Sequence, residues 1–379
     1  MAGAPTYDGL VPPVLLGAGG TGGHMFPAQA VAEALKRRGH RVLLITDARG
    51  NRFTDAFPAD RIVEISAANP NARGPMAKVS AALALTGGLI RSLQEIRRAG
   101  VAVAVGFGGY PSFPALQAAA LSRVRYGVHE QNSLLGRANR ALTGKAAFVA
   151  HGFSVLKGVP TGKASRIVSV GNPVRGAVAD LAASPYAAPH SNDPFRLLIT
   201  GGSQGASLFA HAPAKALAGL PTGLQRRLVV THQVRAEDAA GVRAIYEGAG
   251  ISHTVAPFFE DLPAAMAQAH LVIARAGAST LTELATIGRP SLLVPLAIAM
   301  DDHQTVNAQT LVAAGAATLL AEHHFTEDAV RTALAQAMEN PDKLAHMAAQ
   351  TNGLVPGDAA NAIVDLIEEQ VATAGGQPK

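Results

Sequence analysis

Two glycine-rich turns, each between a short apolar run and a helical pattern, constrain the fold of this 379-residue chain more than any other feature. The first, residues 17–27, follows Val14-Leu15-Leu16, and the second, residues 201–206, follows residues 195–200. A turn of this kind lets backbone N–H groups come close to an anion or a sugar. The order of strand, glycine turn and helix is typical of a parallel sheet covered by helices.

Apolar runs and helical patterns alternate along both halves of the chain. Candidate strands of the first half are residues 14–16, 41–46, 101–105, 127–129 and 148–150. Candidate strands of the second half are residues 196–200, 228–231, 254–257, 271–274 and 291–294. The first helical pattern runs from Ala28 to Arg38. Pro27, directly before it, suits the first helical position, and Gly39 directly after it ends the helix. This alternation predicts an α/β chain of two Rossmann-like domains, whose parallel sheets face a cleft between the domains.

The amino-acid composition excludes several kinds of chemistry and ligand. Since the chain has no cysteine, disulfides and thiolate chemistry are excluded, and a reducing compartment is expected. Aromatic residues make up only 4% of the chain, too few for the stacking platforms that bind nucleic acid. The formal charge of +5 suits anionic substrates or an anionic membrane surface. Residues 1–10 lack the pattern of a signal peptide, and the apolar stretch 79–93 is interrupted by Thr86-Gly87-Gly88, so no membrane-spanning helix is predicted.

The first glycine turn admits two classes of ligand. Gly17-x-Gly19-x-x-Gly22 matches the dinucleotide fingerprint, and Asp47 ends the next predicted strand, where an acid would bind a ribose. However, the turn continues into His24, and a second glycine turn opens the other half of the chain. A histidine beside such a turn adds proton chemistry to an anion- or sugar-binding surface, although a structural histidine fits the same pattern. The turn therefore favours a sugar-phosphate substrate over a dinucleotide.

Three further segments place small or polar residues after predicted strands. Residues 106–112 form another glycine turn, and residues 129–132, His-Glu-Gln-Asn, end a strand at the edge that faces the ligand crevice of a parallel sheet. Residues 275–283 open a helix with small residues and hydroxyls, which suits a phosphate. There Glu283 either binds a ribose diol or forms a capping box with Thr280.

An acidic pair, Asp301-Asp302, precedes His303 and Gln304. Because these side chains are adjacent in sequence and not spaced along one helix face, they disfavour a metal site. The aspartate and glutamine side chains can recognise sugar hydroxyls, and Asp301 or Asp302 can also cap the following helix. Both interpretations stay open from these residues alone.

Six motifs in one order carry a resemblance to a known family. They are residues 19–28, 108–110, 129–132, 171–175, 201–206 and 301–308. Together they resemble the MurG family, the bacterial N-acetylglucosaminyltransferases of peptidoglycan synthesis. The resemblance implies a GT-B fold and inverting transfer of N-acetylglucosamine from UDP-N-acetylglucosamine to the C4 hydroxyl of lipid I, which is undecaprenyl-diphosphate-linked N-acetylmuramoyl-pentapeptide. The product would be lipid II, and the resemblance implies neither a metal nor another cofactor.

The resemblance also assigns domains and site residues. Residues 1–175 would face the acceptor and the membrane, residues 176–355 would bind the UDP-sugar, and a helix in 356–379 would pack back on the first domain. The residues expected to contact the donor are Thr21, Gly22, Gly23, Asn132, Arg175, Ser203, Phe259, Ala278, Ser279, Thr280, Leu281, Thr282, Glu283 and Gln304. The apolar segment 296–300 departs from the family, whose members often carry tyrosine or polar residues there.

Inverting transfer needs a base for the acceptor hydroxyl and stabilisation of the departing diphosphate. The candidate base is His24, with Glu130 orienting it or serving in its place. Arg175, the Ser203 turn and the helix from Ala278 would stabilise the diphosphate. Because lipid I is a membrane lipid, the protein is expected to bind peripherally to the cytoplasmic face of the bacterial inner membrane through residues 76–98, which combine apolar and basic side chains.

Three alternative functions stay open from the sequence, as does the oligomeric state. A UDP-N-acetylglucosamine 2-epimerase would share the two-domain architecture but isomerise the donor. A non-catalytic subunit would bind the sugar nucleotide without turnover, and an NAD-dependent oxidoreductase would use the first glycine turn for its cofactor.

Overall fold

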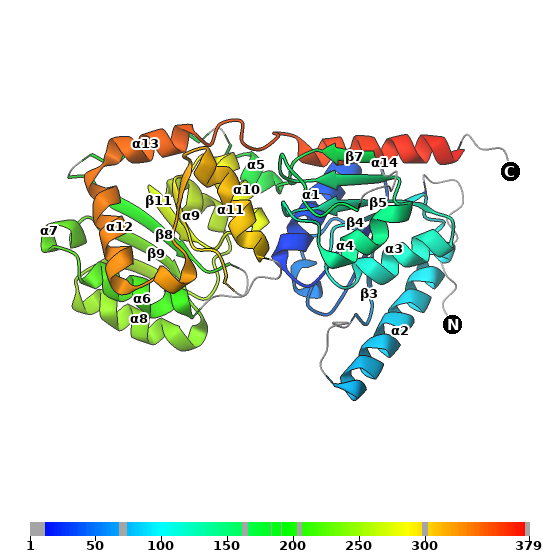
Figure 1. Ribbon diagram of the computed structural model, residues 1–379, viewed down its shortest axis with the longest axis horizontal. Helices are drawn as coiled ribbons and strands as arrows, with labels where there is room; N and C mark the ends of the chain where they lie inside the picture. The colour runs from blue at the N-terminus through cyan, green and yellow to red at the C-terminus, as the bar shows by residue number, and fades with distance from the viewer. Residues whose placement is uncertain are drawn as a thin grey trace. The chain divides into compact units, whose positions relative to one another are not determined.

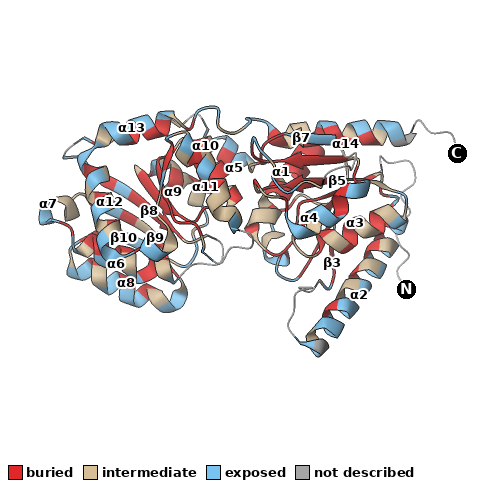
Figure 2. Cartoon of the chain, in the orientation of Figure 1, coloured by how far each residue is buried: buried red, intermediate tan, exposed pale blue. Residues whose placement is uncertain are grey.

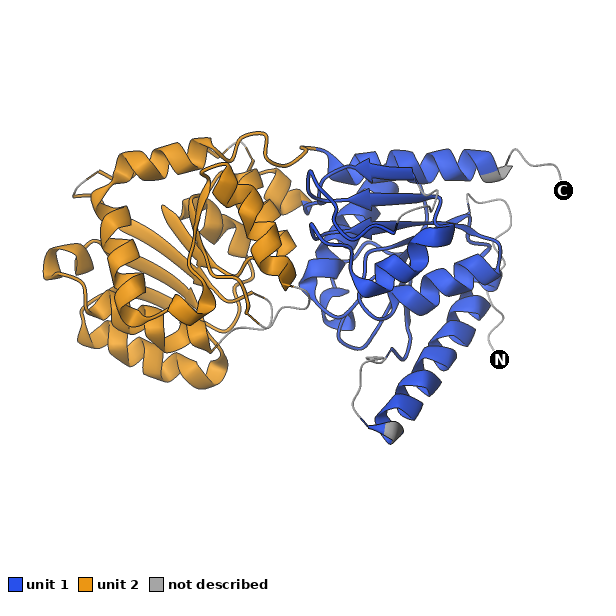
Figure 3. Cartoon of the chain, viewed as in Figure 1, with its two compact units in different colours: residues 1–175, 358–379 blue, residues 176–357 orange. Residues whose placement is uncertain are grey.

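The computed structural model describes residues 12–67, 74–160, 166–182, 184–190, 192–202, 207–297 and 302–375 (Figure 1). The chain forms two compact units (Figure 3). Unit 1 comprises Met1–Arg175 and Asp358–Lys379, and unit 2 comprises Gly176–Gly357. The end of the chain thus returns to the unit in which the chain began.

Unit 1 is built on a seven-stranded sheet with the order β3-β2-β1-β4-β5-β6-β7, in which every neighbouring pair is parallel. Its strands are β1 (Val14–Gly17), β2 (Val42–Thr46), β3 (Arg61–Glu64), β4 (Val103–Gly106), β5 (Arg125–Glu130), β6 (Phe148–His151) and β7 (Arg166–Ser169). Its helices are α1 (Gly22–Arg37), α2 (Pro75–Ala99), α3 (Ser112–Leu121), α4 (Arg137–Leu142) and α14 (Ala359–Gly375), with short 3-10 turns η1 (Asn51–Phe53) and η2 (Thr143–Lys145).

Helices cover both faces of this sheet, because successive side chains of a strand point to opposite faces. Val14 and Leu16 belong to the core shared with α1 and α14, whereas Leu15 belongs to the core shared with α2 and α3. The apolar side of α14, including Ile363 and Ile367, is fully buried there. The strands of the sheet are accordingly largely buried between the two helical layers (Figure 2).

Unit 2 repeats the plan with a six-stranded parallel sheet of order β10-β9-β8-β11-β12-β13. Its strands are β8 (Phe195–Thr200), β9 (Leu228–Gln233), β10 (Ser252–Ala256), β11 (Leu271–Ala274), β12 (Ser291–Leu293) and β13 (Ala317–Leu319). Its helices are α5 (Gly176–Ala179), α6 (Leu208–Ala218), α7 (Thr222–Gln225), α8 (Ala236–Gly248), α9 (Leu262–Gln268), α10 (Ala278–Ile287), α11 (His303–Ala313), α12 (Glu327–Glu339) and α13 (Pro341–Ala349), with the 3-10 turn η4 (Glu322–His324).

The first strand of each unit lies at a topological switch point. β1 lies between β2 and β4, and β8 lies between β9 and β11. At such a point the connections leave the sheet towards opposite faces, which opens a ligand-binding crevice at the carboxyl ends of the strands. Both glycine-rich turns follow these two strands, so the prediction of two Rossmann-like parallel-sheet domains is confirmed.

Every predicted strand is present, and the structure adds β3, β7 and β13, which the sequence did not reveal. Each added strand is the outermost of its sheet. Edge strands expose much of their surface, and β7 in particular has no buried residue. Without a continuous apolar run, such segments do not stand out from loops.

Helix α1 begins at Gly22, not at the predicted Ala28, so Pro27 lies inside the helix. The carbonyl of Thr21 accepts from the N–H groups of His24 and Met25, both at 3.1 Å, and these bonds start the helix before the proline. Pro27 gives up only the single bond that its missing N–H would have made one turn back. The glycine turn is consequently shorter than predicted, and His24 belongs to the first turn of a helix.

Helix α2 continues through Thr86-Gly87-Gly88, the residues that interrupt its apolar stretch. Gly88 is buried, and a Cβ atom there would come within 2.8 Å of the carbonyl oxygen of Ser66. The glycine therefore allows a close approach between helix and chain and does not break the helix. Within the described ranges, no helix has the length and hydropathy to cross a membrane.

Candidate functional site

The glycine turn of unit 1 meets the loop after β4. Gly108 and Gly109 have φ values of 92° and 78°, which side chains rarely tolerate. A Cβ atom on Gly109 would lie 3.2 Å from the backbone nitrogen of Gly19 and closer still to the carbonyl of that residue. Glycine at these positions lets the two loops at the switch point pack backbone against backbone.

Asp47 braces this turn. Its Oδ1 atom accepts from the backbone N–H groups of Gly20 and Gly50, both at 2.9 Å, and its Oδ2 atom pairs with Arg49 at 2.8 Å. Its side chain is 5% exposed. Since both carboxylate oxygens are engaged within the protein, Asp47 is not presented to a ribose, and the dinucleotide interpretation loses its second element.

His24 lies in the first turn of α1, partly buried. Its Nδ1 atom lies 3.2 Å from Oε1 of Gln131, which follows β5. Its ring lies against Gly108, where a Cβ atom would come within 2.8 Å of Nδ1. Among the described residues, none hydrogen-bonds to Nε2.

Glu130 is engaged within its own loop. Its carboxylate accepts from the backbone N–H groups of Asn132 and Gly136, both at 3.0 Å, and from the side-chain amides of Asn132 and Asn139, at 2.9 and 2.8 Å. The residue is 2% exposed, and within the described part of the chain His24 is not a partner of its carboxylate. Its contacts therefore suit holding Asn132 in place more than proton transfer.

The other predicted residues of unit 1 gather around the same end of α1. Thr21 is the N-cap of the helix, and Gly22 and Gly23 form its first residues. The guanidinium of Arg175 stacks on the ring of Phe26, 3.9 Å from its centroid. A cation on this side of α1 adds to the positive end of the helix dipole, so this surface suits an anion.

In unit 2, α10 begins directly after the loop that follows β11. Its N-cap is Gly277, so Thr280 lies inside the helix, and the alternative in which Thr280 and Glu283 form a capping box is wrong. Thr282 bonds back to the carbonyl of Ala278 at 2.8 Å. The first turn of α10 follows a glycine N-cap, and the N-terminus of a helix carries the positive end of its dipole, which suits a phosphate.

The loop that precedes α11 is held by Gln304 and by an ion pair. Gln304 Oε1 accepts from the N–H of Leu296 at 3.0 Å, and Glu322 accepts from the N–H of Ala297 at 2.6 Å. Glu322 in turn pairs with the nearly buried Arg275 at 3.0 Å. Burial opposes ionisation, but the Ala297 amide and Arg275 outweigh it and keep the pKa of Glu322 below its usual value.

Asp302 occupies the N-cap position of α11 with a φ of 51°, and its side chain makes no cap bond. A non-glycine residue in this region is strained, which is common at functional sites.

Phe259 is partly buried in the loop after β10. Ser203, Asp301 and residues 298–300 lie outside the described residues, and in the described ranges no cluster of His, Asp and Glu could hold a metal ion.

Gln233, which no sequence motif singled out, connects two loops of unit 2. The hydroxyl of Thr200 donates to Oε1 of Gln233 at 2.6 Å. Nε2 of Gln233 donates to the carbonyl of Pro257 at 3.2 Å. Thr200 precedes the second glycine turn, and Pro257 precedes Phe259. The polar pair His232-Gln233 at the end of β9 was the signal, since it repeats the pattern that residues 129–132 show in unit 1.

Two buried histidines make stability depend on pH. Burial lowers the pKa of His129 in unit 1 and of His232 in unit 2 from 6.5 to about 4. The unfolded chain therefore binds protons that the folded chain does not, between about pH 6.5 and pH 4. We expect the free energy of unfolding to be highest above pH 6.5, to fall by about 3 kcal/mol per histidine towards pH 4 and to level off below it.

Urea unfolding at half-unit steps from pH 7.5 to 4.5 measures this loss. The window avoids most carboxylate titration, and each histidine signal can be followed separately by NMR. A free energy of unfolding that stays flat from pH 7 to 5 would contradict the expectation.

Comparison with known proteins gives consistent matches over nearly the whole chain. The glycosyltransferase family 28 N-terminal domain matches residues 14–151, and the family 28 C-terminal domain matches residues 196–369. The UDP-N-acetylglucosamine--N-acetylmuramyl-(pentapeptide) pyrophosphoryl-undecaprenol N-acetylglucosamine transferase of Methylobacterium sp. (strain 4-46) is 47% identical, covering 96% of this chain and 98% of the relative. The enzyme of that name from Phenylobacterium zucineum (strain HLK1) is 44% identical, covering 94% and 97%.

Solved structures give the same picture. The crystal structure of Acinetobacter baumannii MurG has a TM-score of 0.73 and 30% identity, covering 94% of this chain and 99% of that one. UDP-GlcNAc 2-epimerase from Neisseria meningitidis, solved with UDP-GlcNAc bound, has a TM-score of 0.65 but only 15% identity, covering 94% and 100%. The epimerase shares the fold alone.

Proposed function

We propose residue roles for this chain on the premise that it belongs to the MurG family of N-acetylglucosaminyltransferases. The chain transfers N-acetylglucosamine from UDP-N-acetylglucosamine to lipid I and forms lipid II. The transfer would be an inverting, in-line displacement at the anomeric carbon by the C4 hydroxyl of the N-acetylmuramoyl unit. Unit 1 would hold the acceptor and the general base, and unit 2 would hold the UDP-sugar.

His24 would be the general base. The observation that carries this assignment is the geometry of its ring, with Nδ1 bonded to Gln131 and no hydrogen bond to Nε2 from the described residues. A base needs an unprotonated nitrogen that a hydroxyl can reach. Asn132, held by Glu130, and Arg175, stacked on Phe26, would line the same side of unit 1.

Unit 2 would bind the donor through backbone amides and a few side chains. The first turn of α10, residues 278–282, would hold the diphosphate, and Glu283 would accept hydrogen bonds from the ribose hydroxyls. Phe259 would meet the uracil, Ser203 the diphosphate, and Gln304 the hydroxyls of the transferred sugar. Since Gln304 also bonds Leu296, sugar binding would be coupled to the shape of that loop.

One assay with labelled UDP-N-acetylglucosamine and a lipid I analogue tests this function. We expect label in a lipid II product with inverted anomeric configuration, at a rate that added EDTA does not change. Donor alone should give no UDP-N-acetylmannosamine, the product that an epimerase would make. Donor binding without product would instead support a non-catalytic sugar-nucleotide-binding subunit.

We propose that α2 docks the protein on the cytoplasmic face of the inner membrane. Met76, Val79, Leu83 and Ile90 are 86%, 61%, 69% and 51% exposed. Their spacing places them along one side of the helix, with basic residues 91, 97 and 98 at its far end. Leu89 and Leu93, which the sequence included in the docking face, pack against the core instead.

Replacing Val79 and Leu83 together by glutamate is expected to abolish binding to anionic liposomes, because it removes apolar contact and adds charge repulsion. Sedimentation with phosphatidylglycerol-containing vesicles measures the effect. Leu121→Glu is the control, since Leu121 is 62% exposed on α3. Equal sedimentation of the double variant and the wild type would exclude α2 as the docking element.

A further inference from the structure

A chain of hydrogen bonds leads from His24 into the core of unit 1. His24 Nδ1 lies 3.2 Å from Gln131 Oε1, and Gln131 Nε2 lies 3.1 Å from His129 Nδ1. His129 Nε2 lies 3.0 Å from the carbonyl oxygen of Gly171. The chain thus has one end at the candidate base and the other at a backbone carbonyl.

The carbonyl of Gly171 fixes the proton positions along this chain, because a carbonyl oxygen can only accept. His129 must therefore donate from Nε2. Since burial lowers the pKa of His129 to about 4, the ring is neutral at pH 7 and its Nδ1 carries a lone pair. That lone pair accepts from the amide N–H of Gln131, which turns the amide oxygen of Gln131 towards His24.

We propose that Gln131 and His129 are positioning residues that hold His24 in its Nδ1–H tautomer. The amide oxygen of Gln131 accepts the Nδ1 proton, so the lone pair of neutral His24 lies on Nε2. Which nitrogen carries the proton decides whether a histidine can act as base towards a given hydroxyl. The inference rests on the proposed function, in which His24 Nε2 takes the proton of the acceptor hydroxyl.

The residues around this chain of hydrogen bonds hold it rigidly in place. His129 is 0% exposed and lies against the ring of Phe107, 5.5 Å between centroids. Gln131 is 2% exposed, and its backbone carbonyl accepts from the side-chain amide of Asn172 at 3.0 Å. The side-chain amide of Gln131 can rotate only if it loses its hydrogen bonds to both His24 and His129. Such a rotation would leave buried polar groups unpaired.

The wild-type protein supplies the first test. Imidazole ¹⁵N NMR of histidine-labelled protein at pH 7.5 and above, assigned by comparison with His24→Gln, reports which nitrogen of His24 is protonated. We expect the Nδ1–H form. An Nε2–H form would overturn the proposal without any variant that must fold.

Two variants test the cause of this preference. Gln131→Met removes the acceptor, and His129→Phe removes only the group that orients the Gln131 amide. Both are expected to shift His24 towards the Nε2–H tautomer and to lower kcat about tenfold or more, with KM for UDP-N-acetylglucosamine unchanged. Gln131→Glu, which still presents an acceptor to His24, should keep the Nδ1–H form. Gln29→Met on α1 is the matched control and should change neither quantity.

The results separate this inference from the proposed function. If His24→Ala abolishes turnover but folded Gln131→Met keeps the wild-type tautomer and kcat, the relay is wrong and His24 stays the base. If His24→Ala keeps full turnover, His24 is not the base, whatever its tautomer.

Discussion

Replacing His24 by alanine is expected to lower kcat about a hundredfold or more while leaving the Kd for UDP-N-acetylglucosamine unchanged. The acceptor hydroxyl must lose its proton as the new bond forms, and the variant has no nitrogen at this place to take it. Donor binding should survive because the proposed donor contacts of unit 2 do not involve this ring. Turnover with a lipid I analogue and calorimetric titration of the donor measure the two quantities.

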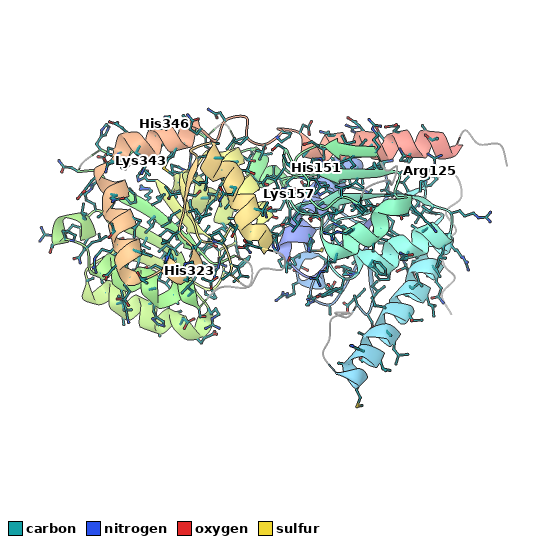
Figure 4. All side chains as sticks on the ribbon, in the orientation of Figure 1. Arg125, His151, Lys157, His323, Lys343 and His346 are labelled. Atoms are coloured by element: carbon teal, nitrogen blue, oxygen red, sulfur yellow. The ribbon has the colours of Figure 1, made fainter. Side chains whose placement is uncertain are left out.

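His346→Ala provides the matched control. His346 is an exposed histidine on α13 of unit 2 (Figure 4). Its loss should leave both kcat and donor binding at wild-type values. Turnover of the His24 variant within a few-fold of wild type would show that His24 is not the base. Glu130 would then be the next candidate for that role.

Replacing Glu283 by alanine is expected to weaken UDP-N-acetylglucosamine binding about a hundredfold or more. A carboxylate that accepts from two ribose hydroxyls makes charge-assisted hydrogen bonds, each contributing about 1.5–3 kcal/mol. Because Gly277 and not Thr280 is the N-cap of α10, no capping box is lost, and the effect on ligand binding should exceed the effect on the stability of α10. Titration with UDP-N-acetylglucosamine and thermal unfolding separate the two effects.

Glu339→Ala is the control for this variant, since Glu339 is an exposed glutamate at the end of α12 in the same unit. Binding of 2′-deoxy-UDP gives an independent check, because a ligand without the 2′-hydroxyl makes only one of the two bonds and should discriminate less between wild type and the Glu283 variant. Unchanged affinity for UDP-N-acetylglucosamine, or a large fall in the melting temperature, would contradict the assigned role.

The central strands of both sheets were predictable because burial on two faces requires continuous apolar runs. β1, with all of its residues buried, is an example. The edge strands β3, β7 and β13 were not predictable for the opposite reason, since they are partly solvated. The rule that glycine and proline end helices also fails where contacts with other residues matter. Gly88 lies inside α2 at a place where another segment approaches closely. Pro27 lies inside α1 because bonds to Thr21 begin the helix before it.

The motif residues could be identified from the sequence, but the residues that they contact could not. Asp47 looked like a ribose acid and proves to brace the glycine turn. Glu130 looked like a catalytic carboxylate, and its oxygens hold the loop around Asn132. Gln233 drew no attention although it joins two loops, because nothing in the sequence says that Thr200 and Pro257 approach each other.

The sequence by itself determined the class of fold and the family, and it supplied the candidate site residues, because periodicity and motifs depend on neighbours along the chain. Only the tertiary structure decided which nitrogen of His24 is free. That choice depends on Gln131, His129 and the Gly171 carbonyl, which come from two segments distant in sequence from His24. A proton position is fixed by the donors and acceptors within about 3 Å. Contacts at that range between distant segments exist only once the sheet has formed.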